Sequence, residues 1–231
     1  MIAQSKLSYH EAKLALTHTI LPKLMYPLTA TTISKTDSNH IMRPILEACL
    51  PKMGLVKSLG YDFIHGSQDL QGLGIPDLYH YSFGQQIEFI IDHTWRWTET
   101  GKLIQMEIQE LWVELGTRSV FDVKASPRIS EGLITQNTMI FAIREYLIEQ
   151  QITLHIPTLI DTYLLAREDD NLLMDELAKL PKYMLSTREF RDFNYCRLFK
   201  RVRNLLDLMQ FKWNILLLSS MVLGSILQRR R

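Results

Sequence analysis

The stretch that decides the fold runs over residues 79–116 and reads YHYSFGQQIEFIIDHTWRWTETGKLIQMEIQELWVELG. Starting at Phe83, apolar side chains recur four, seven, eight and twelve residues later, which predicts an amphipathic helix over 79–97. The pattern resumes at Ile104, and Gly116 is a natural C-cap for this second helix. Two neighbouring helices of this length favour a chain that is all-α or nearly so.

Helical patterns continue on both sides of this pair. Two capping boxes of the form Ser-x-x-Glu, which start helices, are Ser8 with Glu11 and Ser186 with Glu189. Asp37 or Ser38 can cap a further helix that stops at Pro51, and Pro22 is expected to break or kink the first helix. Glycines mark a loop-rich stretch over 52–77, and strand patterns are few. The predicted fold class is therefore mainly α, with few or no strands.

The composition is that of a globular protein. With 231 residues, of which 46% are hydrophobic and 22% charged, the chain is long enough for a sizeable core and is not disordered throughout. Two cysteines cannot form a disulfide scaffold, and they suit a reducing compartment. The N-terminal sequence MIAQSKLSYH has no apolar segment of the kind found in secretory signals, so an intracellular location, cytoplasmic or nuclear, is expected.

Charge is distributed unevenly along the chain, although its total is only +1. Residues 1–57 have a net charge of +4, residues 58–178 of −12 and residues 179–231 of +9. The two basic ends could contact the phosphates of a nucleic acid. Alternatively, the basic C-terminal part could pack on the acidic middle, and the sequence does not decide between these interpretations.

Motifs of known enzyme chemistry are missing from the sequence. It contains no P-loop, G-x-G-x-x-G, H-E-x-x-H, C-x-x-C or G-x-S-x-G pattern, and its seven histidines show no metal-ligand spacing. The acidic triplet at 168–170 precedes an apolar helical pattern, a place where carboxylates favour a helix N-terminus; the alternative is a site for two catalytic metal ions. We therefore expect neither a metal ion nor a cofactor.

A basic cluster follows the second capping box. Its members are Arg197, Lys200, Arg201 and Arg203, with Phe190, Phe193, Tyr195 and Phe199 interleaved among them. The spacing places the four basic side chains on the polar side of one helix. Such a stripe can follow a phosphate backbone while aromatic side chains stack on exposed bases. The alternative is a solvated helix face above a core of aromatic side chains.

The C-terminal part contains an apolar run. Residues 213–227 carry no charge and are followed by Arg229, Arg230 and Arg231. The run is shorter than the about 20 residues that cross a bilayer, so a buried or interfacial helix is predicted within 211–231. An apolar helix with a basic end could also lie on an anionic membrane surface.

Several sequence blocks, taken in order, resemble a known family. The most specific are YPLTATT at 26–32, LPKMG at 50–54 and QGLG at 71–74; others are IIDHTWRWTETGKL at 90–103 and FRDFNYCRLFKRVRNLLDL at 190–208. Their order and spacing are similar to those of the region after the catalytic palm in non-LTR (LINE-like) retrotransposon reverse transcriptases. The resemblance covers roughly residues 8–208, with 117–185 only loosely matched. Its downstream block has an N-x-C-R-L core, here Asn194, Cys196, Arg197 and Leu198.

The resemblance implies a thumb-like helical bundle, which in that family holds a primer–template duplex against the palm. With the patterns above, it suggests a thumb-like helical domain over 1–116, a helical connector over 117–210 and an apolar C-terminal helix with a basic tail over 211–231. The fingers, the palm and its aromatic-x-Asp-Asp motif, which binds the catalytic metals, have no counterpart in this sequence. We therefore expect a truncated fragment that is not an enzyme.

The expected function is to bind nucleic acid, either duplex or RNA–DNA hybrid, without polymerase activity. The basic side chains expected to contact phosphates are Lys23, Lys35, Arg43, Lys52 and Lys57 in the N-terminal block, and Arg197, Lys200, Arg201 and Arg203 in the C-terminal block. The alternative function is that of a helical protein-interaction or membrane-associated protein that uses the apolar run at 213–227. The oligomeric state is left open.

Overall fold

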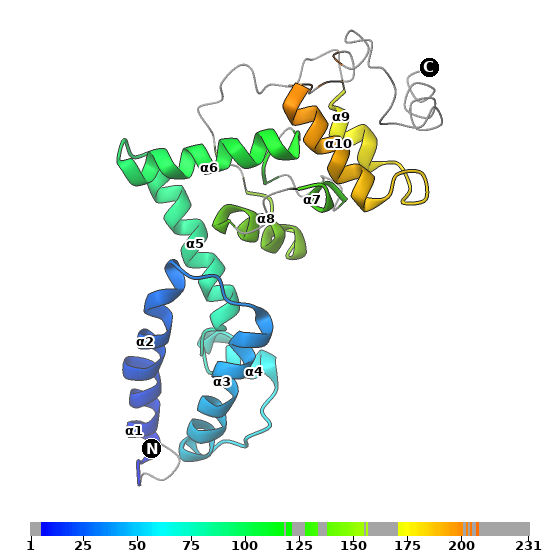
Figure 1. Cartoon of the computed structure of the whole chain (residues 1–231). Helices are drawn as coiled ribbons and strands as arrows, with labels where there is room; N and C mark the ends of the chain where they lie inside the picture. Colours follow the sequence, from blue (N-terminus) through cyan, green and yellow to red (C-terminus); the bar gives the residue numbers. More distant parts are fainter. Residues whose placement is uncertain are drawn as a thin grey trace. The chain divides into compact units, whose positions relative to one another are not determined.

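The chain is mainly helical and divides into two units, residues 1–92 and 93–231 (Figure 1). The computed structural model describes residues 6–117, 119–121, 128–133, 138–154, 156, 171–200, 202, 204 and 207. Within these ranges there is no strand, and the β-type pairing consists of one isolated bridge between Leu172 and Asn204. The predicted mainly-α fold class is confirmed.

The first unit consists of short helices joined by tight turns. Its α-helices are α1 (Tyr9–Leu14), α2 (Leu21–Met25), α3 (Lys35–Cys49), α4 (Tyr61–His65) and α5 (Leu78–Thr94), the last of which crosses the division between the units. A π-helix (Ala15–Ile20) and three 3₁₀ turns (Tyr26–Thr29, Leu50–Met53 and Gln68–Leu70) complete the series. The predicted box at Ser8 and Glu11 starts α1, with both reciprocal hydrogen bonds present.

Pro22 changes the hydrogen-bond pattern of the N-terminal helical stretch without breaking it. A proline inside a helix lacks the amide hydrogen and collides with the carbonyl four residues earlier. The π-helix that precedes α2 widens the turn, and the Leu21 amide donates to Leu16 O, five residues back. At the position of the predicted break or kink, the structure therefore has a local π-type bulge between α1 and α2.

The helix α3 begins earlier than the sequence predicts. Its N-cap is Ser34, whose Oγ accepts a hydrogen bond from the Asp37 amide at 3.1 Å, so Asp37 lies inside the first turn. Ser38, the other predicted cap, is buried within the helix. The assignment of the cap to Asp37 or Ser38 was wrong because Ser34-x-x-Asp37 acts as a cap of the Ser-x-x-acid type.

The QGLG block closes a compact loop beside α4. The amide of Ile75 donates to Ile64 O at 3.1 Å, and the amide of Gly74 donates to Gly66 O at 2.9 Å. Gly72 approaches so closely that a Cβ atom there would overlap the backbone of Gly66. The loop thereby brings Ile75 into the core of the first unit, beside apolar side chains from α1, α3 and α4.

Asp77 forms the N-cap of α5. Its Oδ1 accepts a hydrogen bond from the Tyr79 amide at 2.8 Å, and its Oδ2 accepts one from the Tyr61 hydroxyl. Partial burial by itself would raise the pKa of this carboxyl. The hydrogen bonds from Tyr61 and the Tyr79 amide, with nearby His65 and His80, outweigh burial and lower the pKa from its usual value.

The second unit contains α6 (Glu99–Leu115), α7 (Arg128–Glu131), α8 (Met139–Glu149), α9 (Leu173–Ala178) and α10 (Thr187–Lys200). Helix α6 packs with α8 and α10, and α7 packs with α9 and α10. Because of these contacts α6 belongs to the second unit, so the division falls at residues 92 and 93 and not at the expected boundary at 116. Gly116 has a positive φ of 63° and caps α6 as predicted.

The expected helix over 79–97 ends three residues earlier than predicted, because α5 stops at Thr94. Thr98 then caps α6, so residues 95–97 form the turn between the two helices. Other predictions lie outside the described residues, namely those for the acidic triplet 168–170, for Arg201 and Arg203, and for the apolar run 213–227. None of the helices in the described ranges combines the length and hydropathy that a membrane crossing requires.

Candidate nucleic-acid interface

The five basic residues proposed in the N-terminal block all lie at or near the surface of the first unit. Four of their side chains are exposed and that of Lys52 is half-buried. They are Lys23 on α2, Lys35 and Arg43 on α3, Lys52 in the 3₁₀ turn after α3, and Lys57 in the loop that follows. These positions leave most of the basic side chains open to a polyanion, because surface Lys and Arg side chains are long and flexible.

One exposed row of side chains on α3 contains both positively and negatively charged residues. Lys35, Asn39, Arg43 and Glu47 follow one another at intervals of four residues and are all exposed. Arg43 Nε donates to Glu47 Oε1 at 2.9 Å. This hydrogen bond and the charge of Glu47 raise the pKa of Arg43 above its usual value. A phosphate that binds Arg43 must therefore compete with the Glu47 carboxylate.

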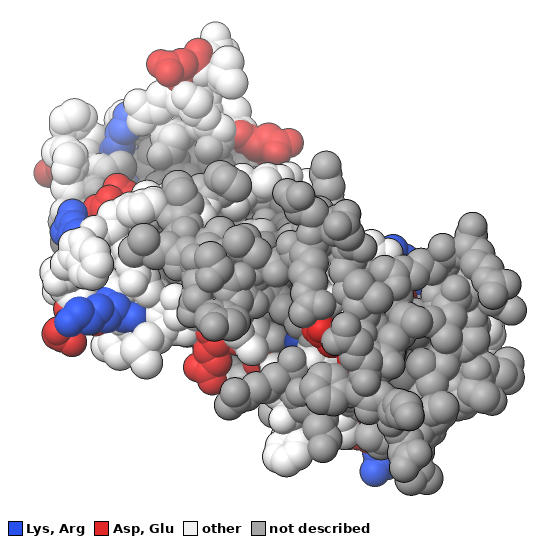
Figure 2. Space-filling model, turned by 90° about the horizontal axis from the view of Figure 1, so that it is seen from above, with Lys and Arg blue, Asp and Glu red and all other residues white. Residues whose placement is uncertain are grey.

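Charge in the first unit is separated along the sequence. Residues 58–92 contain five Asp and Glu residues and neither Lys nor Arg, so the excess of positive charge is confined to 1–57. On the face of the chain drawn in Figure 2, several of the blue Lys and Arg side chains lie beside red Asp and Glu side chains. The candidate phosphate contacts of the first unit are therefore confined to the helices and loop of the N-terminal block.

Arg197, which the sequence pattern places on a polar helix face, is buried. Only 2% of its surface is exposed. Its Nη2 donates to Val113 O at 2.9 Å and to Glu114 O at 2.8 Å, and its Nε donates to Asn194 Oδ1 at 2.9 Å. The prediction that Arg197 contacts phosphate is therefore corrected, because the guanidinium hydrogen-bonds protein oxygens in the interior.

The physical reason for this placement is the end of α6. The last carbonyl groups of a helix lack amide partners within it, and the helix dipole makes that end negative. The guanidinium of Arg197 supplies both donors and charge there, while Asn194 Nδ2 donates to Glu114 O at 3.2 Å and to Gly132 O at 3.0 Å. Within the N-x-C-R-L core, Asn194 and Arg197 therefore tie α10 to the end of α6.

The remaining members of the C-terminal cluster differ from Arg197. Lys200 is the last residue of α10, and its side chain is outside the described atoms, as are Arg201 and Arg203 entirely. The interleaved aromatic side chains divide into two groups: Phe190 and Phe193 are buried, and Tyr195 and Phe199 are exposed. Phe190 and Phe193 therefore belong to a core of aromatic side chains beneath the polar face of the helix, as the second of the two interpretations predicted.

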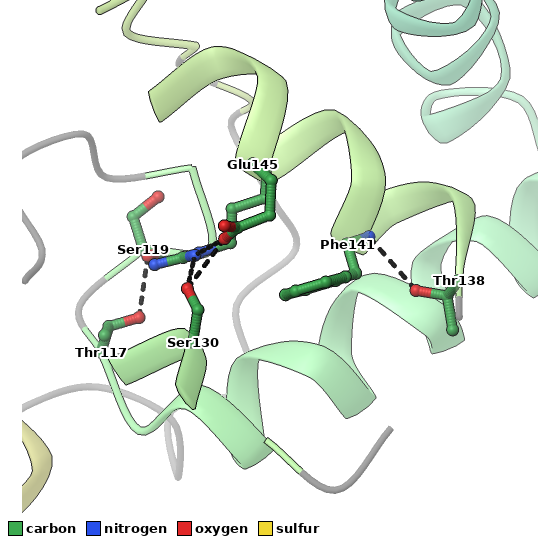
Figure 3. A network of polar contacts seen from close by, with 7 residues as sticks. Thr117, Ser119, Ser130, Thr138, Phe141 and Glu145 are labelled. Atoms are coloured by element: carbon green, nitrogen blue, oxygen red, sulfur yellow. Dashed lines mark hydrogen bonds and ion pairs between the residues drawn. The ribbon is translucent and has the colours of Figure 1, made fainter. Parts of the chain in front are cut away.

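Two further arginines of the second unit are also buried. Arg144 donates to Ser130 Oγ at 2.6 Å and to Glu145 Oε1 at 2.7 Å, and Figure 3 shows Ser130 and Glu145 turned toward the same point from α7 and α8. Arg128 donates to the carbonyl oxygens of Leu180 and Leu185, and its guanidinium lies 5.3 Å from the centre of the Phe190 ring. Both guanidinium groups join segments of the protein itself.

The described residues show no constellation that suggests catalysis by a metal. They contain no group of three or more His, Cys, Asp or Glu side chains that could hold an ion. Cys49 is buried, which raises the pKa of its thiol and makes it a poor nucleophile. Among the described side chains, the exposed basic residues of the N-terminal block are thus the strongest candidates for binding a ligand.

Comparison with known proteins adds no relative: the chain matches no family model, no curated protein and no solved structure.

Proposed function

We propose that the chain is a reverse-transcriptase-like fragment of the non-LTR retrotransposon kind, which binds duplex nucleic acid or RNA–DNA hybrid without regard to sequence. The order and spacing of the YPLTATT, LPKMG and QGLG blocks support this origin. The observation that carries the binding proposal is the exposure of the basic side chains on α2, α3 and the following loop. No polymerase activity is proposed, because the sequence contains no aromatic-x-Asp-Asp motif.

The test is the salt dependence of binding by the full chain. Fluorescence anisotropy of labelled duplex DNA and of RNA–DNA hybrid, titrated at several salt concentrations, is expected to give a steep loss of affinity with salt. Each phosphate contact contributes about 0.9 to the slope of log K against log salt on duplex DNA. The double variant Lys35→Gln with Arg43→Gln is therefore expected to reduce the slope by up to about 1.8.

The matched control is the double variant Arg188→Gln with Arg191→Gln. These two arginines are exposed on α10 and lie outside the proposed interface, so this variant removes the same charge from another surface. Equal slopes for both double variants would show that binding depends only on total charge. Failure of the unaltered chain to bind either probe at low salt would remove the proposed function.

The ion pair between Arg43 and Glu47 on α3 provides a second test, in which the affinity for duplex is expected to increase. Glu47→Gln removes the carboxylate that holds Arg43 and one negative charge from the same helix row. It is expected to increase affinity for duplex and to steepen the salt slope, because Arg43 is released to contact phosphate. Both side chains of the pair are exposed, so its loss is expected to leave the folded state intact.

A second candidate function is protein interaction or membrane association. The exposed face of α6 favours it, because Leu103, Met106 and Val113 are three and seven residues apart and so lie on one side of the helix, as on a helix-pairing surface. The apolar run 213–227, with its arginines, is the other sequence element that favours it. Liposome flotation of the full chain and of a chain that ends at Gln210 tests the membrane version. Recovery of both in the soluble fraction would exclude it.

A further inference from the structure

Two tryptophans with an arginine between them are exposed in the turn between α5 and α6. Trp97 is 88% exposed and Trp95 is 52% exposed, and Arg96 is also exposed. Tryptophan is on average among the more buried residue types, because its large apolar surface is costly to leave in water. Packing within the described part of the chain therefore does not account for two exposed indoles in one turn.

The backbone of this turn is held in place on both sides. The Arg96 amide donates to His93 O at 3.0 Å, at the end of α5. The Thr98 side chain accepts from the Gly101 amide at 3.1 Å and caps α6. A Cβ atom at Gly101 would collide with the backbone oxygens of Arg96 and His93, so glycine is needed for the turn to close this tightly. The positions of the tryptophans are thus set by the fold.

The side chains of the turn suit a ligand in which a flat, electron-rich ring lies next to a negatively charged group. Indole rings stack on nucleobases, and the arginine between the two indoles adds positive charge to the turn. The nearest acidic side chain on α6, Glu99, is bound to Lys102 at 2.8 Å, which offsets its repulsion of phosphate. Bases inside a duplex are already stacked, so only an unpaired base can use such a site.

We propose that the Trp95–Trp97 turn is a stacking site for an unpaired base of single-stranded DNA or RNA. The inference rests on the proposed nucleic-acid function and adds to it a second kind of contact. The basic residues of the N-terminal block bind phosphates of a duplex, whereas this turn binds the base of a single strand. A duplex with a single-stranded overhang offers both phosphates of paired nucleotides and unpaired bases.

The test compares ordinary and abasic oligonucleotides of equal length and charge, using the full chain. The probes are a labelled oligothymidylate and a labelled strand of the same length without bases. Loss of one stacked base costs about 1–3 kcal/mol, so Trp97→Ala is expected to weaken oligothymidylate binding about tenfold. Binding of the abasic strand and of duplex is expected to stay unchanged, and Trp97→Phe is expected to retain part of the affinity.

The matched control is Tyr183→Ala, since Tyr183 is an aromatic residue that is 85% exposed elsewhere on the second unit. It is expected to leave oligothymidylate binding unchanged. Equal affinities of the unaltered chain for the oligothymidylate and the abasic strand would overturn the stacking site while retaining the proposed function, provided that duplex is bound. Absence of binding to every nucleic acid would overturn both proposals.

Tryptophan fluorescence gives an independent readout. Addition of oligothymidylate is expected to quench the emission of the full chain, and Trp95→Phe with Trp97→Phe is expected to abolish most of that quenching. If anionic phospholipid vesicles shift the emission through these residues and the oligothymidylate does not, the turn is a membrane contact and the stacking proposal fails.

Discussion

The side chain of Arg197 supplies hydrogen-bond donors to carbonyl groups at the end of α6. Its partners, Val113 O and Glu114 O, would otherwise be buried or half-buried acceptors without helical amide donors. Arginine suits this position because its planar guanidinium presents several donors in fixed directions. A lysine ammonium cannot reproduce that geometry.

Replacement of Arg197 is therefore expected to destabilise the second unit strongly. Arg197→Met removes the guanidinium donor from both carbonyls, which leaves Glu114 O with the Asn194 amide alone, and is expected to cost about 3 kcal/mol; Arg197→Lys is expected to recover little of this. Urea unfolding followed by circular dichroism measures the change. The control is Arg191→Met on an exposed position of the same helix, which is expected to stay within about 0.5 kcal/mol of the original chain.

Asp77 predicts a pH dependence of stability in the first unit. Its pKa is lower in the folded chain than in the unfolded chain, so the carboxylate stabilises the fold above the unfolded pKa of about 3.9. This contribution is lost as the pH falls through the still lower folded pKa. Asp77→Ala is expected to cost about 1 kcal/mol at neutral pH, in line with the loss of an N-cap.

The measurement is urea unfolding of both chains between neutral and acidic pH. The difference in unfolding free energy between the original chain and Asp77→Ala is expected to shrink below about pH 4. A difference that is constant over this range would mean that the carboxylate charge does not stabilise the N-cap of α5.

At the scale of single elements, two glycines of the first unit have opposite roles. Gly72 lies against the backbone of Gly66 in the loop beside α4, so a methyl group has no room. Gly84 lies within α5, and a Cβ atom there would meet nothing within 4 Å. Glycine inside a helix is destabilising relative to alanine, because it loses more backbone entropy on folding.

The two glycines form a matched pair of substitutions. Gly84→Ala is expected to stabilise the chain by about 0.5–1 kcal/mol, whereas Gly72→Ala is expected to destabilise it by more than that through displacement of the loop. Thermal unfolding of both variants measures the difference. A melting temperature that rises for both would show that the QGLG loop can move away from α4 at little cost.

Elements whose determinants are local could be predicted from the sequence. The boxes at Ser8 and Ser186 involve residues three apart, and both form as expected. The start of α3 was misplaced although its cap is equally local, because Asp37 competes with Ser34 as a candidate. Pro22 was expected to break or kink a helix, and a shift to π-type hydrogen bonding accommodates it.

The candidate sites show the same division between local and long-range causes. Exposure of Lys23, Lys35 and Arg43 follows from the cost of burying an unpaired charge. Burial of Arg197 could not be predicted, because its carbonyl partners are more than 80 residues away in the sequence. The exposed turn at Trp95 and Trp97 was assigned to a helix, since apolar periodicity does not show where a cap will end it.

At the scale of the whole molecule, the first unit has a core of its own. Every buried residue of its apolar cluster lies between Ala12 and Leu78. A fragment that ends at Thr94 is therefore expected to fold without the second unit and to retain duplex binding, because all five candidate residues of the N-terminal block are within it. Cooperative thermal unfolding and a salt-dependent affinity close to that of the full chain would confirm this expectation.

Two results with the fragment that ends at Thr94 would contradict this expectation. A fragment that lacks helical circular dichroism at low temperature would show that the first unit requires the rest of the chain for folding. A fragment that folds but does not bind duplex would place the phosphate contacts in the second unit, which would leave Lys200, Arg201 and Arg203 as the remaining candidates of the predicted set.

The buried arginines of the second unit also have a consequence for how its sequence can vary. Arg128, Arg144 and Arg197 each bind oxygens of segments that are distant along the chain or on another helix. The loops that connect these segments can therefore change in length while the arginines still bind the same oxygens. Insertions are expected to accumulate first in these loops.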